Sequence, residues 1–139
     1  MTFNEATIEE AALTWFSELG YTVVSGADIA PGEPQAERDS FTDVVLLHRL
    51  QEAVQRLNPK IPDEAREEAI RKLLRQDSPS LIVNNRRFHA MLRDGVEVEY
   101  RRPDGSIAGD RVRLVDFVNP VNNDWLIVNQ FTVISGNVN

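Results

Sequence analysis

The sequence predicts an α+β fold in which four helices are followed by a three-stranded antiparallel meander. Up to residue 95, apolar residues recur with the spacing of amphipathic helices, and from residue 96 the spacing changes to the alternation of strands. Turn-forming residues separate the alternating segments. Because 139 residues suffice for one hydrophobic core, we expect residues 1–139 to form a single domain.

The first helix is predicted from about residue 7 to Leu19. Thr7 and Glu10 have the spacing of a capping box, and Gly20 ends the helix. The next segment, YTVVSG (residues 21–26), is rich in aromatic and β-branched side chains and predicts a short strand. An irregular connection of about fifteen residues follows, and connections of that length inside a domain are often functional.

Three further helices are predicted before residue 96. Ser40 and Asp43 repeat the capping signature and open a second helix that runs to residue 57. Pro62 opens a third helix with acidic residues in its first turn and basic residues in its last, as the helix dipole favours. Ser78 caps a fourth helix, which Gly95 ends.

The three strands are predicted from the remaining segments. VEVEY alternates, RPDGS is typical of a turn, DRVRLVDFV alternates again, and WLIVNQFTVI is nearly all apolar. The last segment has the composition of a strand buried on both faces, which needs a neighbour on each side. Its second neighbour is not evident in the sequence. We therefore expect residues 125–134 to have a free edge that is frayed or covered by a second copy.

The composition excludes several classes of function. Without cysteine, the chain has no disulfide framework, no thiolate zinc site and no cysteine nucleophile, and it suits a reducing cytoplasm. The N-terminus does not have the pattern of a secretory signal, and no apolar run is long enough to span a membrane. A formal charge of −7 repels polyphosphate, so the chain alone is expected to bind nucleic acid poorly.

Few residues have the spacing of a catalytic motif. His48 and His89 lie in separate predicted helices without HxH or HExxH spacing, so packing or surface roles are favoured over a shared metal. No GxxxxGK[ST], GxGxxG or GxSxG segment occurs. Glu10 is explained by the capping box, whereas Glu9 is left without a structural role.

Two further groups of charged residues have alternative interpretations. Asp116, on a predicted apolar strand, is compatible with a divalent-cation ligand or with a solvent-facing position beside Arg113. A set of arginines is compatible with one side of a phosphate-binding groove, but solvated surface charge is favoured because neighbouring strand residues face opposite ways. These arginines are Arg86, Arg87, Arg101, Arg102, Arg111 and Arg113.

The order of segments also resembles a known family. The segments IEEAALTWFSELGY, ERDSFTDVVLLHRLQEAVQRLNPKIPDEAREEAIRKL, NNRRFHAMLRDGVEVEYR and VRLVDFVNPVNNDWLIVNQFTV follow one another as at the start of the R subunit of type I restriction enzymes. The most specific pieces are LNPKIP, FHAMLRDGV and DFVNPVNNDWLIVNQFTV. The resemblance covers nearly the whole chain.

This resemblance implies the first part of a restriction-endonuclease-like fold, in a nuclease domain of the PD-(D/E)xK kind with a mixed sheet flanked by helices. In that family a Pro-Asp strand and the next strand, which carries (D/E)xK, bind magnesium for DNA cleavage. Motor domains follow and hydrolyse ATP to translocate DNA. The implied partners are DNA and the methyltransferase and specificity subunits.

The catalytic motifs of the family have no match in this chain. The two lysines, Lys60 and Lys72, are preceded two positions earlier by Asn58 and Ile70, so no (D/E)xK occurs. The two Pro-Asp pairs are predicted at a helix start and in a turn. We therefore expect an N-terminal part of the subunit that ends before these motifs, is inactive alone and binds neither magnesium nor ATP by itself.

Of the family's site positions, the resemblance carries over only a first-helix glutamate near the metal, which matches Glu9. Asp116 matches the family's DF pair, to which no catalytic role is assigned. The alternative function is a non-enzymatic interaction module, or a remnant, that associates through its sheet edge. In either case the exposed edge allows self-association as one outcome, and no membrane partner is expected.

Overall fold

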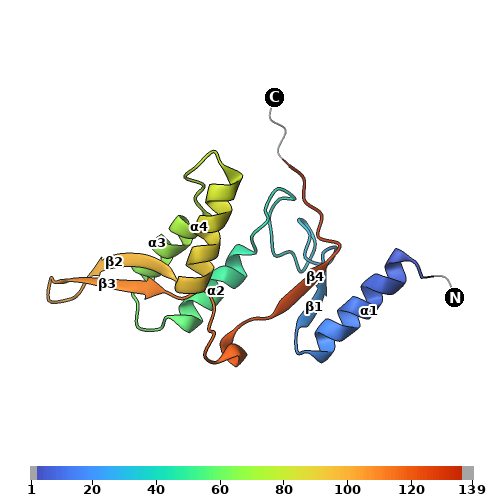
Figure 1. Cartoon of the computed structure of the whole chain (residues 1–139), viewed down its shortest axis with the longest axis horizontal. Coiled ribbons are helices and arrows are strands. Elements are labelled where there is room, and N and C mark those ends of the chain that lie inside the picture. Colours follow the sequence, from blue (N-terminus) through green and yellow to red (C-terminus); the bar gives the residue numbers. More distant parts are fainter. Residues whose placement is uncertain (1–2, 136–139) are drawn as a thin grey trace. The chain divides into compact units, whose positions relative to one another are not determined.

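The computed structural model describes residues 3–135 (Figure 1). Its contacts divide the chain into two compact units, here called the terminal unit (residues 1–47 and 124–139) and the central unit (residues 48–123). The expectation of a single domain stays a prediction. Within residues 3–135, no helix has both the length and the apolar composition that crossing a membrane requires.

The terminal unit consists of α1 (Glu5–Glu18), β1 (Thr22–Ser25), a long irregular segment and β4 (Leu126–Asn129). The two strands pair in parallel, with Thr22 opposite Leu126 and Ser25 opposite Asn129. The helix contacts both strands (Figure 1). At the end of α1, the ring of Tyr21 makes edge contacts with Phe16 and Trp125, at centroid distances of 5.3 and 5.6 Å.

The first helix begins earlier than predicted. Asn4 caps it by accepting a 2.9 Å hydrogen bond from the Thr7 backbone amide, so the predicted capping box of Thr7 and Glu10 is wrong. Asparagine caps helices as well as threonine does, and the cap at Asn4 adds residues to the first turn. The end is confirmed, because Gly20 adopts the left-handed conformation directly after the helix, with φ of 98°.

The second helix was predicted to begin too early. It runs as α2 from Leu47 to Leu57, and residues 40–46 are not helical. The Asp43 carboxylate accepts from the Ser40 amide at 3.1 Å, which closes a turn, and the Phe41 carbonyl accepts from the Ile134 amide at 2.9 Å. These bonds use backbone groups that a helix would need, so the apolar pattern after Ser40 does not continue as a helix.

The central unit contains α2, α3 (Asp63–Leu74), α4 (Leu81–Asp94), β2 (Val96–Arg101), β3 (Ile107–Val112) and the short 3₁₀ helix η1 (Pro120–Asn122). The third and fourth helices are confirmed. The fourth is capped by Ser80 instead of Ser78. A contiguous apolar core joins α2, α3 and the hairpin. Its buried members are Val54, Ile61, Ala65, Ala69, Ile70, Val96, Val98 and Val112.

Asn58 connects the end of α2 to the chain after β3. Its side-chain amide donates to the carbonyls of Val54 and Arg113, at 2.8 and 2.9 Å. Its side-chain oxygen accepts from the Arg113 amide at 2.8 Å. Asn58 is 5% exposed, so this buried amide is satisfied entirely by the backbone that it connects.

The predicted three-stranded meander is wrong. β2 and β3 form the predicted antiparallel hairpin, with Val96 opposite Val112, but β4 pairs with β1 instead of β3. Asn58 holds the chain at Arg113, directly after β3, and residues 116–123 then form a turn held by side chains. The chain therefore leaves the hairpin before β4 begins.

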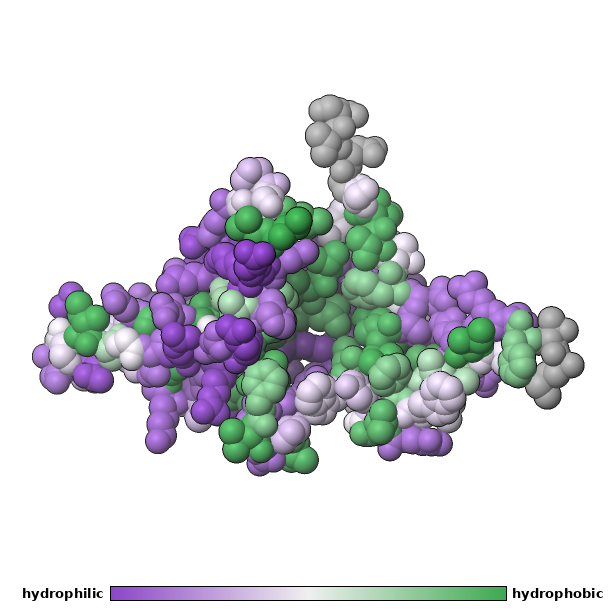
Figure 2. Space-filling model, in the orientation of Figure 1, coloured by the Kyte–Doolittle hydropathy of each residue, from purple (hydrophilic) through white to green (hydrophobic). Residues whose placement is uncertain are grey.

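The last predicted strand is also shorter and less buried than its composition suggests. β4 covers four residues, all of them half-buried, where residues 125–134 were expected. In the part of the chain that the structure describes, β1 is the strand paired with β4, so β4 lies at a sheet edge. Apolar surface remains visible over the region of α1 (Figure 2), where Ile8, Trp15 and Leu19 are exposed.

Candidate functional site

The candidate site is a polar joint where α1 meets the end of β4. Glu9 lies in the second turn of α1 and is half-buried, whereas Glu10 beside it is exposed. Asn129 is the last residue of β4 and Gln130 follows it. Because α1 contacts the parallel strand pair, it brings Glu9 to residues that are 120 positions away in the sequence.

The Glu9 carboxylate accepts hydrogen bonds from two side-chain amides. Asn129 Nδ2 donates to Oε1 at 2.9 Å. Gln130 Nε2 lies 3.1 Å from Oε1 and 2.9 Å from Oε2. Hydrogen bonds to a charged acceptor are stronger than neutral ones, so the two amides hold the carboxylate in one orientation. Because each amide uses its nitrogen here, its oxygen stays available as a ligand or acceptor.

The backbone at this joint is unusual. Gln130 has a φ of 53°, and it is the one residue other than glycine with positive φ among residues 3–135. The Gly26 amide donates to the Asn129 carbonyl at 2.7 Å. A Cβ atom on Gly26 would lie 2.2 Å from the Gln130 carbonyl oxygen, so only glycine allows this approach. The loop after β1 and the end of β4 therefore fix each other.

Arg38 contacts the residues that follow Gln130. Its guanidinium donates to the Thr132 carbonyl at 2.6 Å and to the Asp43 carbonyl at 3.1 Å. It also lies over the Phe131 ring, 3.9 Å from the centroid. Arg38 is 5% exposed, so this cation is buried among backbone carbonyls and aromatic rings.

The charge around the joint is strongly negative. The terminal unit contains ten acidic side chains and one basic side chain, Arg38, which gives a net charge of −9. The central unit contains the remaining 12 acidic and 14 basic side chains, which gives +2. The overall charge of −7 therefore comes from the terminal unit, whose surface attracts cations and repels phosphate.

The joint has oxygen atoms of the kind that magnesium binds. Magnesium prefers oxygen ligands in octahedral geometry and is commonly held by one or two carboxylates, with waters completing its shell. Glu9 provides one carboxylate, and the oxygens of Asn129 and Gln130 are of the right chemical type. No group of three or more histidine, cysteine, aspartate or glutamate side chains comes together within residues 3–135. The residues present thus fit one side of such a site.

Asp116 holds a turn together. This role differs from both interpretations given from the sequence, a divalent-cation ligand and a solvent-facing strand position beside Arg113. It lies outside β3, in the turn of residues 116–123, and its carboxylate accepts from the amides of Val118 and Asn119 at 3.0 and 2.9 Å. Asn122 donates to its other oxygen at 3.0 Å. The Asn119 amide, followed by Asn122, lowers the pKa of this carboxyl below its usual value. Asp116 therefore organises the turn that separates β3 from β4.

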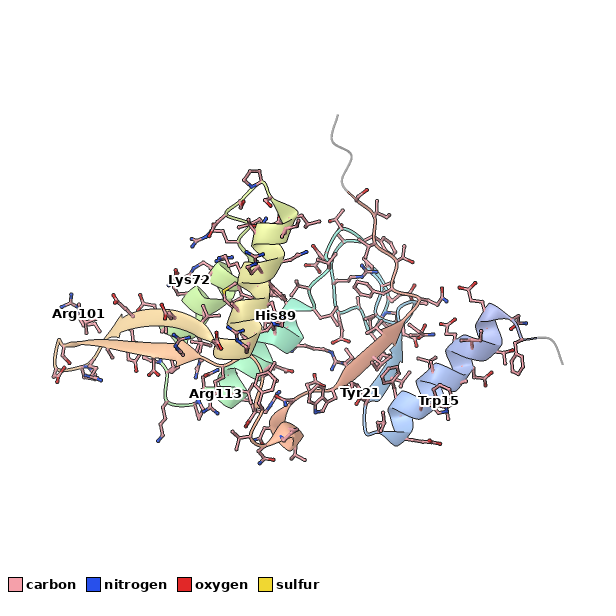
Figure 3. All side chains as sticks on the ribbon, in the orientation of Figure 1. Trp15, Tyr21, Lys72, His89, Arg101 and Arg113 are labelled. Carbon is pink, nitrogen blue, oxygen red and sulfur yellow. The ribbon has the colours of Figure 1, made fainter. Side chains whose placement is uncertain are left out.

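The two histidines lie apart from any joint of this kind. His48, at the start of α2, has its Nε2 3.1 Å from Glu52 one turn later. His89 lies on α4 and is exposed (Figure 3). The packing or surface roles expected for the two histidines stay predictions.

The structure brings part of the predicted arginine set together. Arg87 and Arg111 line one pocket with Lys72, where Arg87 donates to the carbonyls of Arg75 and Lys72 at 2.9 and 2.6 Å. Arg101 lies near the tip of the hairpin, and Arg113 follows β3 (Figure 3). The same pocket is also lined by Asp94 and Glu97, and solvated surface charge stays the favoured prediction for the set.

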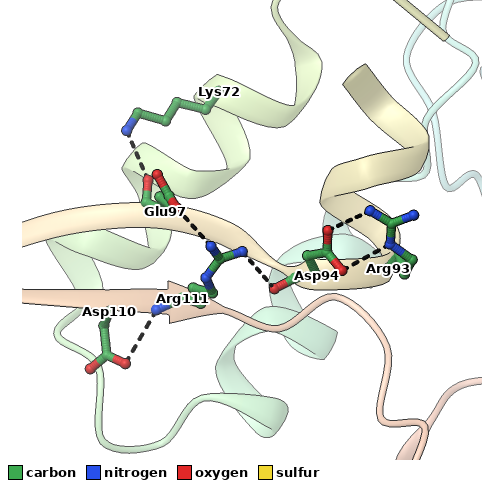
Figure 4. Close-up of polar contacts among 6 residues, drawn as sticks. All are labelled: Lys72, Arg93, Asp94, Glu97, Asp110 and Arg111. Carbon is green, nitrogen blue, oxygen red and sulfur yellow. Dashed lines mark hydrogen bonds and ion pairs between the residues drawn. The ribbon is translucent and has the colours of Figure 1, made fainter. Parts of the chain in front are cut away.

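A network of charges connects α3, α4 and the hairpin (Figure 4). Arg111 donates to Glu97 at 2.8 Å and to the Asp94 carbonyl at 3.4 Å. Lys72 donates to the Glu97 carbonyl at 2.8 Å. Arg93 pairs with Asp94, and this hydrogen bond lowers the pKa of the Asp94 carboxyl. These contacts connect the hairpin to α3 and α4, through two ion pairs and two bonds to backbone carbonyls.

Comparison with known proteins identifies the family. Residues 2–139 match the family described as "Type I restriction enzyme R protein N terminus". The chain belongs to this family. No solved structure matches it significantly.

Two curated relatives belong to the same class. The chain is 36% identical over 132 residues to the type I restriction enzyme HindI endonuclease subunit of Haemophilus influenzae, covering 95% of this chain. It is 30% identical over 130 residues, covering 94% of this chain, to a protein assigned as the type I restriction enzyme MjaIXP endonuclease subunit of Methanocaldococcus jannaschii. Each match covers 12% of the relative. This type I restriction R-subunit sequence thus spans about an eighth of the length of those relatives.

Sequence reasoning singled out Glu9 but missed its neighbours. Asn129 and Gln130 lie in the VNQF segment that carries the family resemblance, yet nothing local indicated that they meet Glu9. Arg38 lies in the irregular connection whose length suggested function. Arg38 is the one basic residue of the acidic terminal unit, and this becomes evident only after the chain has been divided into its two units.

Proposed function

We propose that this chain is the N-terminal part of the nuclease domain of a type I restriction R subunit. In the full subunit, magnesium-dependent DNA cleavage is coupled to ATP-driven translocation. DNA and the methyltransferase and specificity subunits are its partners. The family match and the two endonuclease-subunit relatives support this proposal. The observation that carries the site is the Glu9 carboxylate held at the end of β4 by Asn129 and Gln130.

In this proposal Glu9 contributes one carboxylate to the magnesium site, and the two amides orient it. Magnesium, when bound, neutralises charge on the scissile phosphate and lowers the pKa of an attacking water. The amides of Asn129 and Gln130 keep the carboxylate oxygens pointing in one direction, which removes the rotational freedom that an exposed glutamate has. The acidic surface of the terminal unit raises the local concentration of divalent cations.

The chain by itself is proposed to be inactive. Because no (D/E)xK sequence occurs in its 139 residues, it has no lysine to position a water beside two acidic ligands. A supercoiled plasmid incubated with this chain and magnesium is expected to stay intact. Robust nicking that Glu9→Ala abolishes would show that the chain carries a complete site.

The metal role of Glu9 is tested with a longer subunit that contains this region. Glu9→Gln should reduce DNA cleavage by at least about tenfold and leave ATP hydrolysis unchanged, because the change removes a ligand charge without touching the motor. Glu10→Gln is the matched control, since Glu10 is adjacent, exposed and has no side-chain contact with the joint. Equal cleavage by wild type and Glu9→Gln would contradict the metal role.

A second candidate function is association through the edge of β4. The observation that favours it is that β4 pairs on one side with β1, and no second strand pairs with it within residues 3–135. An open edge offers backbone donors and acceptors to another strand. Light scattering after size-exclusion chromatography tests it: a dimer at high concentration supports edge association, and a strict monomer at every concentration contradicts it.

A further inference from the structure

Arg38 combines three properties that a merely structural arginine does not need. It is the one basic side chain in a unit with ten acidic ones. It is 5% exposed. Its buried Nε has no hydrogen-bond partner within residues 3–135, and its two Nη atoms donate to backbone carbonyls. A buried polar atom without a partner is unfavourable, so an apolar residue of similar length would be a more stable occupant of this space.

What the guanidinium contacts instead is the segment that follows Gln130. Its Nη2 donates to the Thr132 carbonyl at 2.6 Å, and its plane lies 3.9 Å from the centroid of the Phe131 ring. Its Nη1 donates to the Asp43 carbonyl at 3.1 Å, and Phe41 lies 5.2 Å away on the same loop. The arginine thus connects the loop before α2 to the two residues directly after the candidate site.

The second constraint comes from the other side of the same segment. Gly26 approaches the Gln130 carbonyl so closely that no Cβ fits, and its amide bonds the Asn129 carbonyl. Gln130, between these two constraints, has a φ of 53°, a conformation that a residue with a side chain adopts only when its surroundings impose it. That backbone conformation brings the Gln130 amide to both oxygens of Glu9.

We propose that Arg38 is a positioning residue for the candidate site: it holds Phe131 and Thr132 on one side of Gln130 while Gly26 holds Asn129 on the other, and it thereby keeps Gln130 in its left-handed conformation and its amide on the Glu9 carboxylate. Arg38 itself touches neither Glu9 nor a metal. The inference deepens the proposed function, because it assigns a residue that fixes the direction of the proposed ligand. It does not depend on metal binding to be tested.

The test measures the contact between Gln130 and Glu9 by NMR on the 139-residue chain. In the otherwise unmodified protein, Glu9→Gln removes the charged acceptor and should shift the side-chain amide resonances of Gln130. In an Arg38→Met background, the Gln130 resonances should already lie near those of a solvated glutamine. Glu9→Gln should then shift them no further, which is the signature of a lost coupling between the two positions.

A matched control separates positioning from general stability. Arg87 also donates to two backbone carbonyls, those of Arg75 and Lys72, which belong to the central unit. Arg87→Met should lower the midpoint of unfolding and leave the coupling between Glu9 and Gln130 intact. If Arg87→Met abolishes the coupling as well, the loss reports general loosening and the proposal falls.

Two further variants keep the test decisive if Arg38→Met does not fold. Arg38→Lys keeps the charge but replaces the planar fork by a single ammonium group, which cannot stack and donate in two directions at once. Phe131→Leu keeps the arginine and removes the ring beneath it. Each should weaken the coupling while the β2–β3 amide signals stay in place. An unchanged coupling in a folded Arg38→Lys or Arg38→Met protein would overturn the proposal.

The proposal and the proposed function fail separately. The metal role is tested in a longer subunit that contains this region, because the 139-residue chain holds only part of the proposed site. If Glu9→Gln leaves DNA cleavage by the longer subunit unchanged while Arg38→Met still uncouples Gln130, the positioning role stands and the metal role falls. If Glu9→Gln reduces cleavage and the coupling between Glu9 and Gln130 persists in the Arg38→Met protein, the metal role stands and the positioning role falls.

Discussion

The two units are held together in different ways. The central unit has a contiguous apolar core that joins three elements, with four valines less than 2% exposed. In the terminal unit, α1 has no buried residue, and the buried side chains described there include Ile29, Ala30 and Arg38. Hydrogen bonds to backbone carbonyls and amides replace apolar burial at its joints. One unit is organised by burial and the other by directed polar contacts.

This difference matters because apolar burial contributes mainly stability, whereas hydrogen bonds contribute mainly direction. Apolar burial gives much stability and little direction. A hydrogen bond gives a net contribution of only about 1 kcal/mol but fixes distances and angles. A unit that must hold a carboxylate in one orientation gains more from the second kind. Hydrogen bonds, more than apolar burial, therefore fix the orientation of the side chains at the candidate site in the terminal unit.

The units also differ in charge. The terminal unit has a net charge of −9 and the central unit +2. Phosphate is repelled by the first and tolerated by the second, while divalent cations are attracted to the first.

The largest expected effect contrasts two isoleucines. Ile70 is 8% exposed in the central core, so Ile70→Ala leaves a cavity and should lower the free energy of unfolding by about 3 kcal/mol. Ile8 on α1 is 62% exposed, so Ile8→Ala should change it by less than about 0.5 kcal/mol. Urea denaturation followed by circular dichroism measures both. Equal effects would show that the terminal unit has a core of its own.

The next effect concerns a polar contact inside the central unit. Asn58→Ala leaves the Arg113 amide and two carbonyls without their buried partner, so we expect a loss of about 2 kcal/mol. Asn85→Ala, at an exposed position on α4, is the control and should be nearly neutral. Urea denaturation of the two variants gives the comparison. A neutral Asn58→Ala would mean that water replaces the lost bonds, and that the central unit does not depend on them.

A smaller effect is expected at the helix caps. Asn4→Ala removes the cap of α1 in the terminal unit, and Ser80→Ala removes the cap of α4 in the central unit. Each should cost about 1 kcal/mol locally. Neither helix has a fully buried residue, but Met91 near the end of α4 packs against the central core. Amide hydrogen exchange should therefore rise throughout α1 in the first variant and only in the first turn of α4 in the second. If the faster exchange were confined to the first turn in both helices, α1 and α4 would be equally well anchored in their units.

The smallest expected effect is a dependence on pH at Asp116. Its pKa in the folded state is lowered by the Asn119 amide and Asn122, so the contribution of its carboxylate to stability is present above the unfolded pKa of about 3.9. That contribution is lost as the pH falls through the lower, folded value. Asp116→Asn should therefore flatten the decline of the melting temperature at acidic pH. Asp104→Asn, in the hairpin turn, is the comparison: Ser106 lowers the pKa of this carboxyl, so the same argument predicts a flattened decline, but amide signals of residues 116–123 should move only in Asp116→Asn.

An unchanged acid dependence in Asp116→Asn would show that the turn of residues 116–123 does not rely on the charge of this carboxylate. The side-chain amides of Asn122 and Asn123 would then be sufficient to hold it. That outcome would leave the contrast between the units intact, since the turn belongs to the central unit.

Local patterns predicted much of the fold. The end of α1 at Gly20, the strand after it, the third and fourth helices and the β2–β3 hairpin all rest on signals within a few residues. Two signals of the same kind misled. Ser40 and Asp43 have the spacing of a cap, but Asp43 closes a turn instead. Thr7 and Glu10 have the same spacing, but Asn4 is the residue that caps the helix. A spacing shows what a side chain is able to do, and competing partners decide what it does.

The sequence by itself determined the third and fourth helices, the end of α1 and the existence of a hairpin after Gly95. It also determined that no (D/E)xK occurs and that Glu9 needed an explanation beyond its helix. Tertiary structure decided that β4 pairs with β1, that Asn129 and Gln130 meet Glu9, and that the one cation of an acidic unit is buried against Phe131. The physical reason is range. Propensities and caps act within about a turn of helix, whereas these contacts join residues far apart in sequence and form only once the chain has folded.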